Sequence, residues 1–187
     1  MYIALEGIDT TGKSTQIDLL RNIYKNAIFT KEPSDSVFGN KIRDLALHLN
    51  LSNTTQAFLF LADRANHTQE ILLPNKDKLI ISDRSLISGI AYAKDLDFEL
   101  LVKMNLEASL PPNLVIILQS NEVILKKRLS NKENDNIEKN GIEYLLNIQD
   151  RILHTTKMLE VEHICIDCSL DKFEILKTIT SKIDSLL

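Results

Sequence analysis

The stretch that decides the fold reads YIALEGIDTTGKSTQ from residue 2 to residue 16. A short apolar run at residues 2–5 leads directly into G-x-x-x-x-G-K-S, which spans residues 7–14. From Ile17 to Tyr24 the apolar side chains recur at spacings of three and four, which predicts an amphipathic helix. A strand, a glycine-rich turn and a helix in this order predict a phosphate-binding loop, or P-loop.

The residue types in this loop suit a bound triphosphate. Gly7 and Gly12 allow backbone angles that other residues resist, so backbone N–H groups can converge on phosphate oxygens at the positive end of the helix dipole. We expect Lys13 to reach the outer phosphates and the Ser14 hydroxyl to bind Mg²⁺. The predicted ATP-binding residues of the loop are Gly7, Ile8, Asp9, Thr10, Thr11, Gly12, Lys13, Ser14 and Thr15.

Length and composition describe an ordinary globular chain. It has 187 residues, of which 44% are hydrophobic and 26% charged, and we expect one domain over residues 1–187. No apolar run approaches the length of a membrane span, and no basic leader precedes the first apolar run, so we expect no membrane partner and a cytoplasmic location. A net charge of −4 without a long basic run argues against a nucleic-acid partner. Cys165 and Cys168 read as ordinary thiols, because neither a redox context nor a second pair of zinc ligands is present.

Further apolar runs alternate with helical patterns along the chain. Runs at residues 27–30, 79–82, 114–118 and 163–166 are short and unbroken, which is typical of strands buried on both faces of a parallel sheet. Helical patterns cover residues 57–73, 138–159 and 171–187, and Asp171 is placed to cap the last. The order predicts an α/β fold with three layers and a central five-stranded parallel sheet.

A second acidic residue follows a predicted strand. Asp83 comes directly after the run at residues 79–82, at the edge where ligands bind in open α/β sheets. Its carboxylate can hold Mg²⁺, and the neighbouring Arg84 can donate two hydrogen bonds to a phosphate. The nearest string to the guanine-binding N-K-x-D motif is NKDK at residues 75–78, which argues against a GTPase switch.

The residues resemble the thymidylate kinase family. The opening LEGIDTTGKSTQ (residues 5–16) is similar to that of the family, and FTKEP (29–33), FLFLADR (58–64), DRSLISGIAY (83–92) and Ile166-Asp167 resemble its later motifs in the same order. The resemblance spans nearly the whole chain. It implies a P-loop kinase fold with a short lid at about residues 126–140, and Mg²⁺-dependent transfer of the γ-phosphoryl group of ATP to dTMP.

The resemblance also implies roles for single residues. Phe60 would stack on thymine and Arg64 would donate to the base, although alone these residues would read as a core phenylalanine and a surface arginine. Arg84 would hold the dTMP phosphate and Tyr92 would crowd the 2′ side of the sugar. Asp9 would contact the sugar 3′-OH or a Mg²⁺-bound water. The implied set also includes Ser88 for dTMP, Asp167 for ATP, Ser14 and Asp83 for the metal, and Lys13, Asp9, Arg84 and Arg128 for catalysis.

Three segments depart from the family pattern. Thr10 stands where some members have a P-loop arginine, so the lid is expected to supply the transition-state cation. In the lid, Asn131 and Asn136 stand at two expected arginine positions, which leaves Arg128, together with Lys127 and Lys132, as the basic candidates. The sequence Ser34-Asp35-Ser36 also replaces the usual Gly-Gly-Thr.

Two other functions remain open at this stage. A deoxynucleoside kinase would have a similar P-loop, but such kinases usually have Glu-Arg-Ser where this chain has Asp83-Arg84-Ser85. A nucleotide-dependent switch would have the P-loop without a small-molecule acceptor. The family resemblance further implies a homodimer, with which the apolar residues of 57–61 and 86–93 are compatible.

Overall fold

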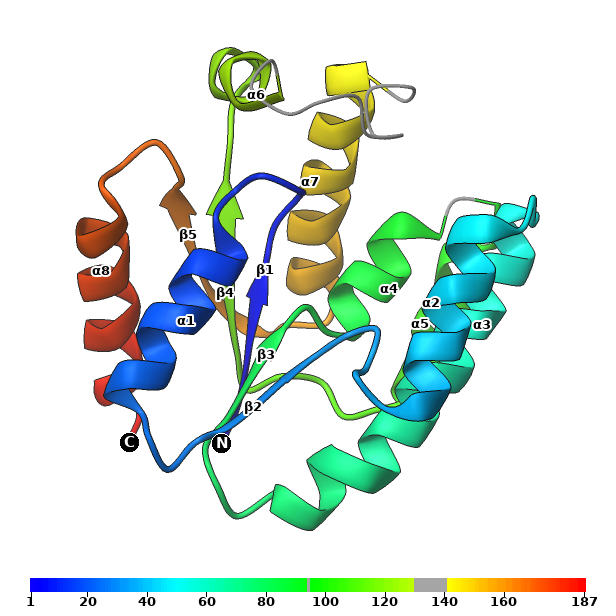
Figure 1. The fold of residues 1–187 in the computed structure, drawn as a ribbon, viewed down its shortest axis with the longest axis horizontal. Helices are drawn as coiled ribbons and strands as arrows, with labels where there is room; N and C mark the ends of the chain where they lie inside the picture. The colour runs from blue at the N-terminus through cyan, green and yellow to red at the C-terminus, as the bar shows by residue number, and fades with distance from the viewer. Residues whose placement is uncertain (94, 130–140) are drawn as a thin grey trace.

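The structure is a computed structural model that describes residues 1–93, 95–129 and 141–187. Its centre is a parallel sheet with the strand order β2-β3-β1-β4-β5 (Figure 1). The strands are β1 (Tyr2–Glu6), β2 (Ile28–Lys31), β3 (Ile80–Asp83), β4 (Leu114–Gln119) and β5 (Glu162–Asp167). The prediction of five parallel strands is confirmed, each within one or two residues of its expected position.

Helices cover both faces of this sheet. The helices are α1 (Lys13–Ile23), α2 (Val37–His48), α3 (Asn53–His67), α4 (Leu86–Tyr92), α5 (Phe98–Ala108), α6 (Glu122–Leu129), α7 (Gly141–Met158) and α8 (Lys172–Asp184). In Figure 1, α1 and α8 lie on one side of the sheet, α4 and α7 lie on the other, and α2, α3 and α5 lie beyond α4. The predicted three-layer arrangement is therefore confirmed.

Strand β4 explains why the apolar runs are unbroken. Val115 and Ile117 belong to the hydrophobic cluster with α4 and α7, whereas Leu114, Ile116 and Leu118 belong to the cluster with α1 and α8. All five side chains are fully buried. Because successive strand residues point to opposite faces, a strand covered on both sides is apolar at every position.

Helix boundaries differ from expectation where caps and prolines act. The helix expected at residues 57–73 begins earlier, because the Ser52 side chain accepts a hydrogen bond from the Thr55 N–H at 3.1 Å. It ends at His67, and a π turn and a 3₁₀ turn that contains Pro74 follow it. Proline lacks a backbone donor and ends regular helix. The predicted cap of α8 is confirmed, since Asp171 accepts from the Phe173 N–H at 2.8 Å.

The carboxyl ends of the strands meet at one edge, where the predicted site residues gather. The P-loop follows β1, Asp83 ends β3, and Asp167 ends β5. Of the expected lid, residues 130–140 lie outside the described part and the earlier ones belong to α6. No described helix combines the length and the apolar character that a bilayer crossing requires.

Candidate active site

The loop between β1 and α1 has a backbone conformation that depends on its glycines. Gly7 has φ +149° and Gly12 has φ +94°, values that residues with a side chain rarely adopt. A Cβ on Gly7 would also lie 2.7 Å from the backbone oxygen of Leu118, so the loop packs closely against β4. The Thr11 hydroxyl donates to the carbonyl of the buried Ile8 at 2.9 Å. Helix α1 begins directly after Gly12, which places the loop at the positive end of its dipole.

Lys13 lies within this loop. Its Nζ donates to the carbonyl oxygens of Gly7 at 2.8 Å and Ile8 at 3.0 Å. Burial, followed by the nearby charge of Arg84, lowers the pKa of Lys13 to about 8. An anion bound by the loop would favour the ammonium form, because an opposite charge stabilises the charged state. Ser14, in contrast, is exposed in the first turn of α1, and so is the next residue, Thr15.

Arg84 connects the P-loop to the helix that follows β3. Its Nη2 donates to Asp9 Oδ1 at 2.7 Å and its Nη1 donates to Ser88 Oγ at 3.0 Å. The guanidinium carbon lies 5.1 Å from the centroid of the Tyr92 ring. Arg84 itself has φ +72°, a strained value for a residue with a side chain. Four of the predicted site residues are therefore in direct contact.

Glu6 is a buried carboxylate to which the sequence analysis gave no role. It accepts hydrogen bonds from the hydroxyl groups of Ser85, at 2.7 Å, and Ser88. Burial raises the pKa of Glu6, and these hydrogen bonds and the charge of Arg84 oppose the rise. The Ser88 hydroxyl thus joins Glu6 to Arg84. The only sequence signal was an acidic residue at the end of an apolar run, directly before Gly7.

A cavity of about 520 Å³ opens beside Arg84, between α3 and α4. Phe60, Arg64, Arg84, Ser88 and Tyr92, all predicted for dTMP, line it. Its other lining residues are Glu32, Pro33, Asn53, Gln56, Ala57, Asp63, Ser85, Gly89, Ala93 and Tyr144. A volume of this size, with three aromatic rings and several polar groups in its lining, is typical of a small-molecule site. Asp9 does not line the cavity but reaches its edge through Arg84.

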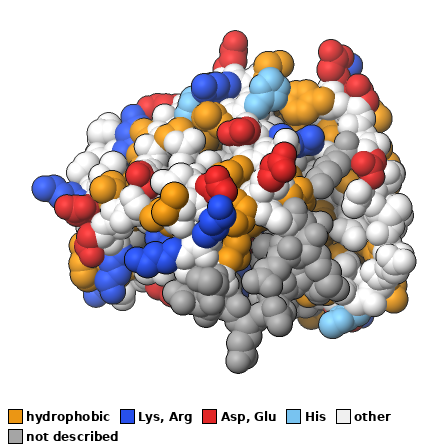
Figure 2. Space-filling view, turned by 90° about the horizontal axis from the view of Figure 1, so that it is seen from above, with side chains coloured by type: hydrophobic (Ala, Val, Ile, Leu, Met, Phe, Trp, Pro, Cys, Tyr) orange, Lys and Arg blue, Asp and Glu red, His pale blue; other side chains and the backbone are white. Residues whose placement is uncertain are grey.

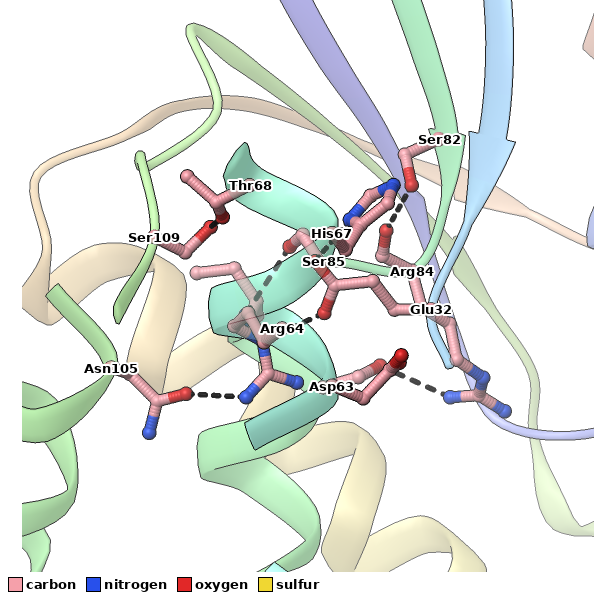
Figure 3. Close-up of polar contacts among 12 residues, drawn as sticks. Glu32, Asp63, Arg64, His67, Thr68, Ser82, Arg84, Ser85, Asn105 and Ser109 are labelled. Carbon is pink, nitrogen blue, oxygen red and sulfur yellow. Dashed lines mark hydrogen bonds and ion pairs between the residues drawn. The ribbon is translucent and has the colours of Figure 1, made fainter. Parts of the chain in front are cut away.

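Arg64 is buried rather than on the surface, and described residues bind two of its nitrogens (Figure 3). Its Nε donates to Glu32 Oε2 at 2.7 Å and its Nη1 donates to Asn105 Oδ1 at 2.6 Å. His67 Nδ1 lies 3.5 Å from the other oxygen of Glu32. Burial acts to raise the pKa of Glu32, but Arg64 and His67 outweigh it and the pKa is lowered. Glu32, His67 and Asn105 were all missed, because nothing in their local sequence indicates a partner so distant in the chain.

The segment Ser34-Asp35-Ser36 is anchored by hydrogen bonds. The Ser34 N–H and hydroxyl donate to the two oxygens of the buried Asp63, both at 2.7 Å. Ser36 caps α2 by accepting from the Gly39 N–H at 2.9 Å. The serines that replace Gly-Gly-Thr therefore fix this loop to α3 and begin α2.

The oxygens at the end of β3 and the start of α1 suit a divalent cation. Asp83 Oδ1 is buried and has no hydrogen-bond partner in the described ranges. Ser14 is exposed at the start of α1, directly after the loop. A carboxylate and a hydroxyl are hard oxygen ligands of the kind that Mg²⁺ prefers. The orphaned oxygen of Asp83 therefore fits a bound cation or its water.

Arg128 extends from α6 onto the P-loop. Its Nη1 donates to the carbonyl of Thr10 and its Nη2 to the carbonyl of Cys168, both at 2.6 Å. Arg128 thus joins the P-loop to the loop after β5, next to Asp167. The Asp167 carboxylate is exposed and accepts from the Ser169 N–H at 2.8 Å, which lowers its pKa. Of the other lid candidates, Lys127 precedes Arg128 in α6 and Lys132 lies outside the described residues.

Comparison with known proteins agrees with this geometry. A sequence model of the thymidylate kinase family matches residues 5–179. The thymidylate kinase of Aliarcobacter butzleri is 50% identical over 182 residues, covering 96% of both chains, and that of Helicobacter hepaticus is 46% identical over 195 residues, covering 100% of both. The chain belongs to the thymidylate kinase family. A solved thymidylate kinase structure from Ehrlichia chaffeensis, 23% identical, shares the fold with a TM-score of 0.77 over 98% of each chain.

Family membership decides between the activities left open by the sequence. Thymidylate kinases transfer the γ-phosphoryl group of ATP to dTMP, so the predicted reaction is confirmed. The two alternatives, a deoxynucleoside kinase and a nucleotide-dependent switch, are not supported.

Cys165 and Cys168 are free thiols, one exposed and one buried. Among the described residues, no three or more His, Cys, Asp or Glu side chains gather into a group that could hold a metal ion by themselves.

Some apolar residues that the sequence offered for a dimer surface are not at the surface. Within residues 86–93, the side chains of Leu86, Ile87, Ile90 and Ala91 are fully buried in the core against α7 and β4, so they cannot meet a partner. The other part, on α3, fares differently. Phe58 is 45% exposed and lies in an apolar groove that α3 shares with α5.

Proposed function

We propose that phosphoryl transfer from ATP to dTMP takes place where the P-loop meets the cavity. The observation that carries this proposal is the 2.7 Å ion pair between Asp9 and Arg84. It joins a P-loop carboxylate to a guanidinium that lines the cavity, so donor and acceptor sites are contiguous. Phosphoryl transfer depends on close positioning of two phosphates and on charge stabilisation, and it requires little covalent chemistry from the protein.

On the acceptor side, the residues that line the cavity have chemistry that suits dTMP. Phe60 lines the cavity with an aromatic ring that would stack on thymine, and Arg64 would provide hydrogen-bond donors for the base. Arg84, now paired with Asp9, would exchange that carboxylate for the dTMP phosphate, because guanidinium binds phosphate with two parallel hydrogen bonds. Ser88 keeps Arg84 in place, and Tyr92 limits room at the 2′ side of the sugar. Asp9, once released, is available to the sugar 3′-OH.

On the donor side, the P-loop residues 7–15 would surround the triphosphate. Lys13 supplies the positive charge, and its position within the loop supports this role. Asp167 lies beyond Arg128 on the same edge of the sheet and would meet the nucleoside end of ATP. A thymidylate kinase requires both nucleotides at once, and neighbouring sites at this edge of the sheet would meet that requirement.

Asp83 and Ser14 would hold Mg²⁺. When bound, this ion would neutralise charge on the phosphates of ATP. The unpartnered Asp83 Oδ1 supports the assignment.

Arg128 is proposed as the cation that the lid segment contributes to the transition state. It already contacts the carbonyl of Thr10, the residue that stands at the P-loop arginine position of other family members. This contact brings a guanidinium to the loop that lacks one. Because the contact of Arg128 with the transferred phosphoryl group would form mainly in the transition state, its effect is expected on turnover rather than on dTMP binding.

A second copy of the chain is proposed to cover the groove between α3 and α5. Phe58, Leu61, Ala62 and Ala65 on α3 face Met104 and Ala108 on α5 across this groove. A contiguous apolar groove on a surface is typical of protein contacts. Sedimentation of the parent and of Phe58→Asp tests it, since a dimer that dissociates in the variant supports the assignment and a monomeric parent contradicts it.

Small nucleotides rather than nucleic acids are proposed as the ligands, and the cytoplasm as the location. Seen from above, the described part of the face at which the strands end carries both basic and acidic side chains, with acidic ones scattered across it (Figure 2). Nucleic-acid binding instead favours a continuous basic surface. The free thiols of Cys165 and Cys168 suit a reducing compartment.

A substrate panel with ATP tests the proposal, with dTMP, dUMP, dGMP and thymidine as acceptors. We expect dTMP to be best and dUMP to be poorer by about 10- to 200-fold in kcat/KM, because a single methyl group distinguishes them. Thymidine lacks the phosphate that Arg84 would hold and should not react. Arg84→Gln should raise the KM for dTMP, whereas Arg21→Gln, which changes an arginine on α1 that lies over the Phe29 ring, should not. Faster reaction of thymidine than dTMP would overturn the proposal.

A further inference from the structure

The guanidinium of Arg64 is held in one orientation beside the cavity. Glu32 binds Nε and Asn105 binds Nη1, at 2.7 and 2.6 Å. Within the part of the chain that the structure describes, Nη2 makes no hydrogen bond. Figure 3 shows the fork of Arg64 between the side chains of Asn105 and Glu32. The remaining nitrogen is therefore the one free to contact a ligand of the cavity that Arg64 lines.

Gly89 on α4 has no side chain, so the guanidinium of Arg64 can lie directly against it. A Cβ at Gly89 would lie 2.3 Å from Arg64 Nη2 and 2.5 Å from both Cζ and Nη1. Gly89 has no positive φ that would require a glycine, and glycine inside a helix is unfavourable relative to alanine. The helix therefore carries an unfavourable residue at a position where a methyl group would collide with Arg64.

We infer that Gly89 and Asn105 are specificity-determining residues of the thymidylate site, which they control through Arg64. Gly89 lets the guanidinium lie against α4, and Asn105 occupies one nitrogen so that the base meets Nη2. The inference rests on the proposed contact between Arg64 and the base. Because a guanidinium only donates hydrogen bonds, the site favours a pyrimidine with a carbonyl oxygen over one with an amino group at the same position.

The Gly89→Ala substitution tests this inference in two backgrounds. In the otherwise unchanged enzyme, the new methyl group should push the guanidinium away, raise the KM for dTMP by about tenfold or more and lower the melting temperature. In the Glu32→Gln/Arg64→Ala background the charged pair is removed as a whole and the space is vacant. There, Gly89→Ala should raise the melting temperature, because alanine is the better helix former, and should leave the KM for dTMP unchanged. The KM for ATP should be the same with and without Gly89→Ala.

The outcomes separate the inference from the proposal beneath it. If Glu32→Gln/Arg64→Ala alone leaves the KM for dTMP at the parent value, the proposed contact of Arg64 with the base is wrong. If that background raises the KM but Gly89→Ala changes neither KM nor melting temperature in the parent, the role of Gly89 is wrong. An equal effect of Gly89→Ala in both backgrounds would also reject it, because the effect would not pass through Arg64.

Asn105→Ala provides a second test without touching α4. It leaves Arg64 Nη1 without its partner, so the guanidinium can turn and the preference for dTMP over dCMP should fall by about fivefold or more in kcat/KM. A merely structural role of Asn105 would lower the melting temperature but leave this ratio unchanged, and that result would overturn its assignment.

Discussion

The contribution of the buried ion pair between Glu32 and Arg64, which both line the cavity, can be tested by replacing Glu32 with glutamine. The two side chains of this pair are only 4% (Glu32) and 5% (Arg64) exposed, and their charged atoms are 2.7 Å apart. Removal of one partner from a buried pair costs about 3–5 kcal/mol, because the other charge stays buried without compensation. Glutamine keeps the shape and one acceptor oxygen, so we expect the lower value, about 3 kcal/mol. For a chain of this size that lowers the melting temperature by about 6–12 °C.

The measurement is thermal unfolding of the ligand-free protein, followed by circular dichroism. Glu122→Gln is the matched control, because Glu122 makes an exposed ion pair with Lys126 one turn further along α6. Exposed pairs contribute little, so the control should melt at the parent temperature. An equal shift in both variants, or a fall of less than about 1 kcal/mol for Glu32→Gln, would refute the reasoning.

The pH dependence of the same pair has a definite sign. The folded-state pKa of Glu32 is lowered, so its carboxylate contributes stability that is fully present above the unfolded pKa of about 4.3. That contribution is lost as pH falls through the lower folded pKa. The difference in melting temperature between parent and Glu32→Gln should therefore be constant above about pH 5.5 and shrink below about pH 4. A difference that grows on acidification would contradict the assigned direction.

Three further predictions concern the proposed nucleotide sites. Arg128→Ala should lower kcat by about tenfold or more with little change in the KM for dTMP, and steady-state kinetics with an unchanged kcat would reject the transition-state role. Phe60→Ala should raise the KM for dTMP but not for ATP, whereas a normal dTMP value would leave Phe60 a packing role. With a pKa of about 8 for Lys13, binding of ATP at pH 8 should take up about half a proton and at pH 6.5 almost none. Calorimetry in buffers of different ionisation enthalpy measures this uptake, and equal values at both pH values would exclude the titration of Lys13.

The sheet and the P-loop were predictable because local patterns specify them. Each strand is short and buried on both faces, so its apolar run survives without help from distant residues. The P-loop depends on Gly7, Gly12 and Lys13 within a single turn between a strand and a helix. The cap at Asp171 follows from the same kind of local chemistry.

Other parts of the site depend on contacts between residues far apart in the sequence. Asn105 meets Arg64 across 41 residues, and the Ser88 hydroxyl meets Glu6 across 82. Such pairs leave no periodic signal, since Asn105 stands in an ordinary amphipathic helix. The helices α2, α4, α5 and α6 were also not predicted. In α2 and α5 several apolar residues are exposed, among them Val37, Leu47 and Leu100, so their apolar positions do not mark a single buried face. Arg64 shows the limit most plainly, since its buried position follows only from its partners.

The contacts of Arg84 support the proposal that the two nucleotide sites lie next to each other. Asp9 belongs to the P-loop and Ser88 to α4, and one guanidinium binds both. Ser88 also donates to Glu6, the last residue of β1. Arg84 is therefore tied to the P-loop directly through Asp9 and to β1 through Ser88 and Glu6. If the acceptor phosphate replaces Asp9 on Arg84, it occupies a position that β1 and the P-loop define on two sides. The geometry of the acceptor is therefore set by the same backbone that holds Lys13, and in-line positioning of two phosphates needs that common reference.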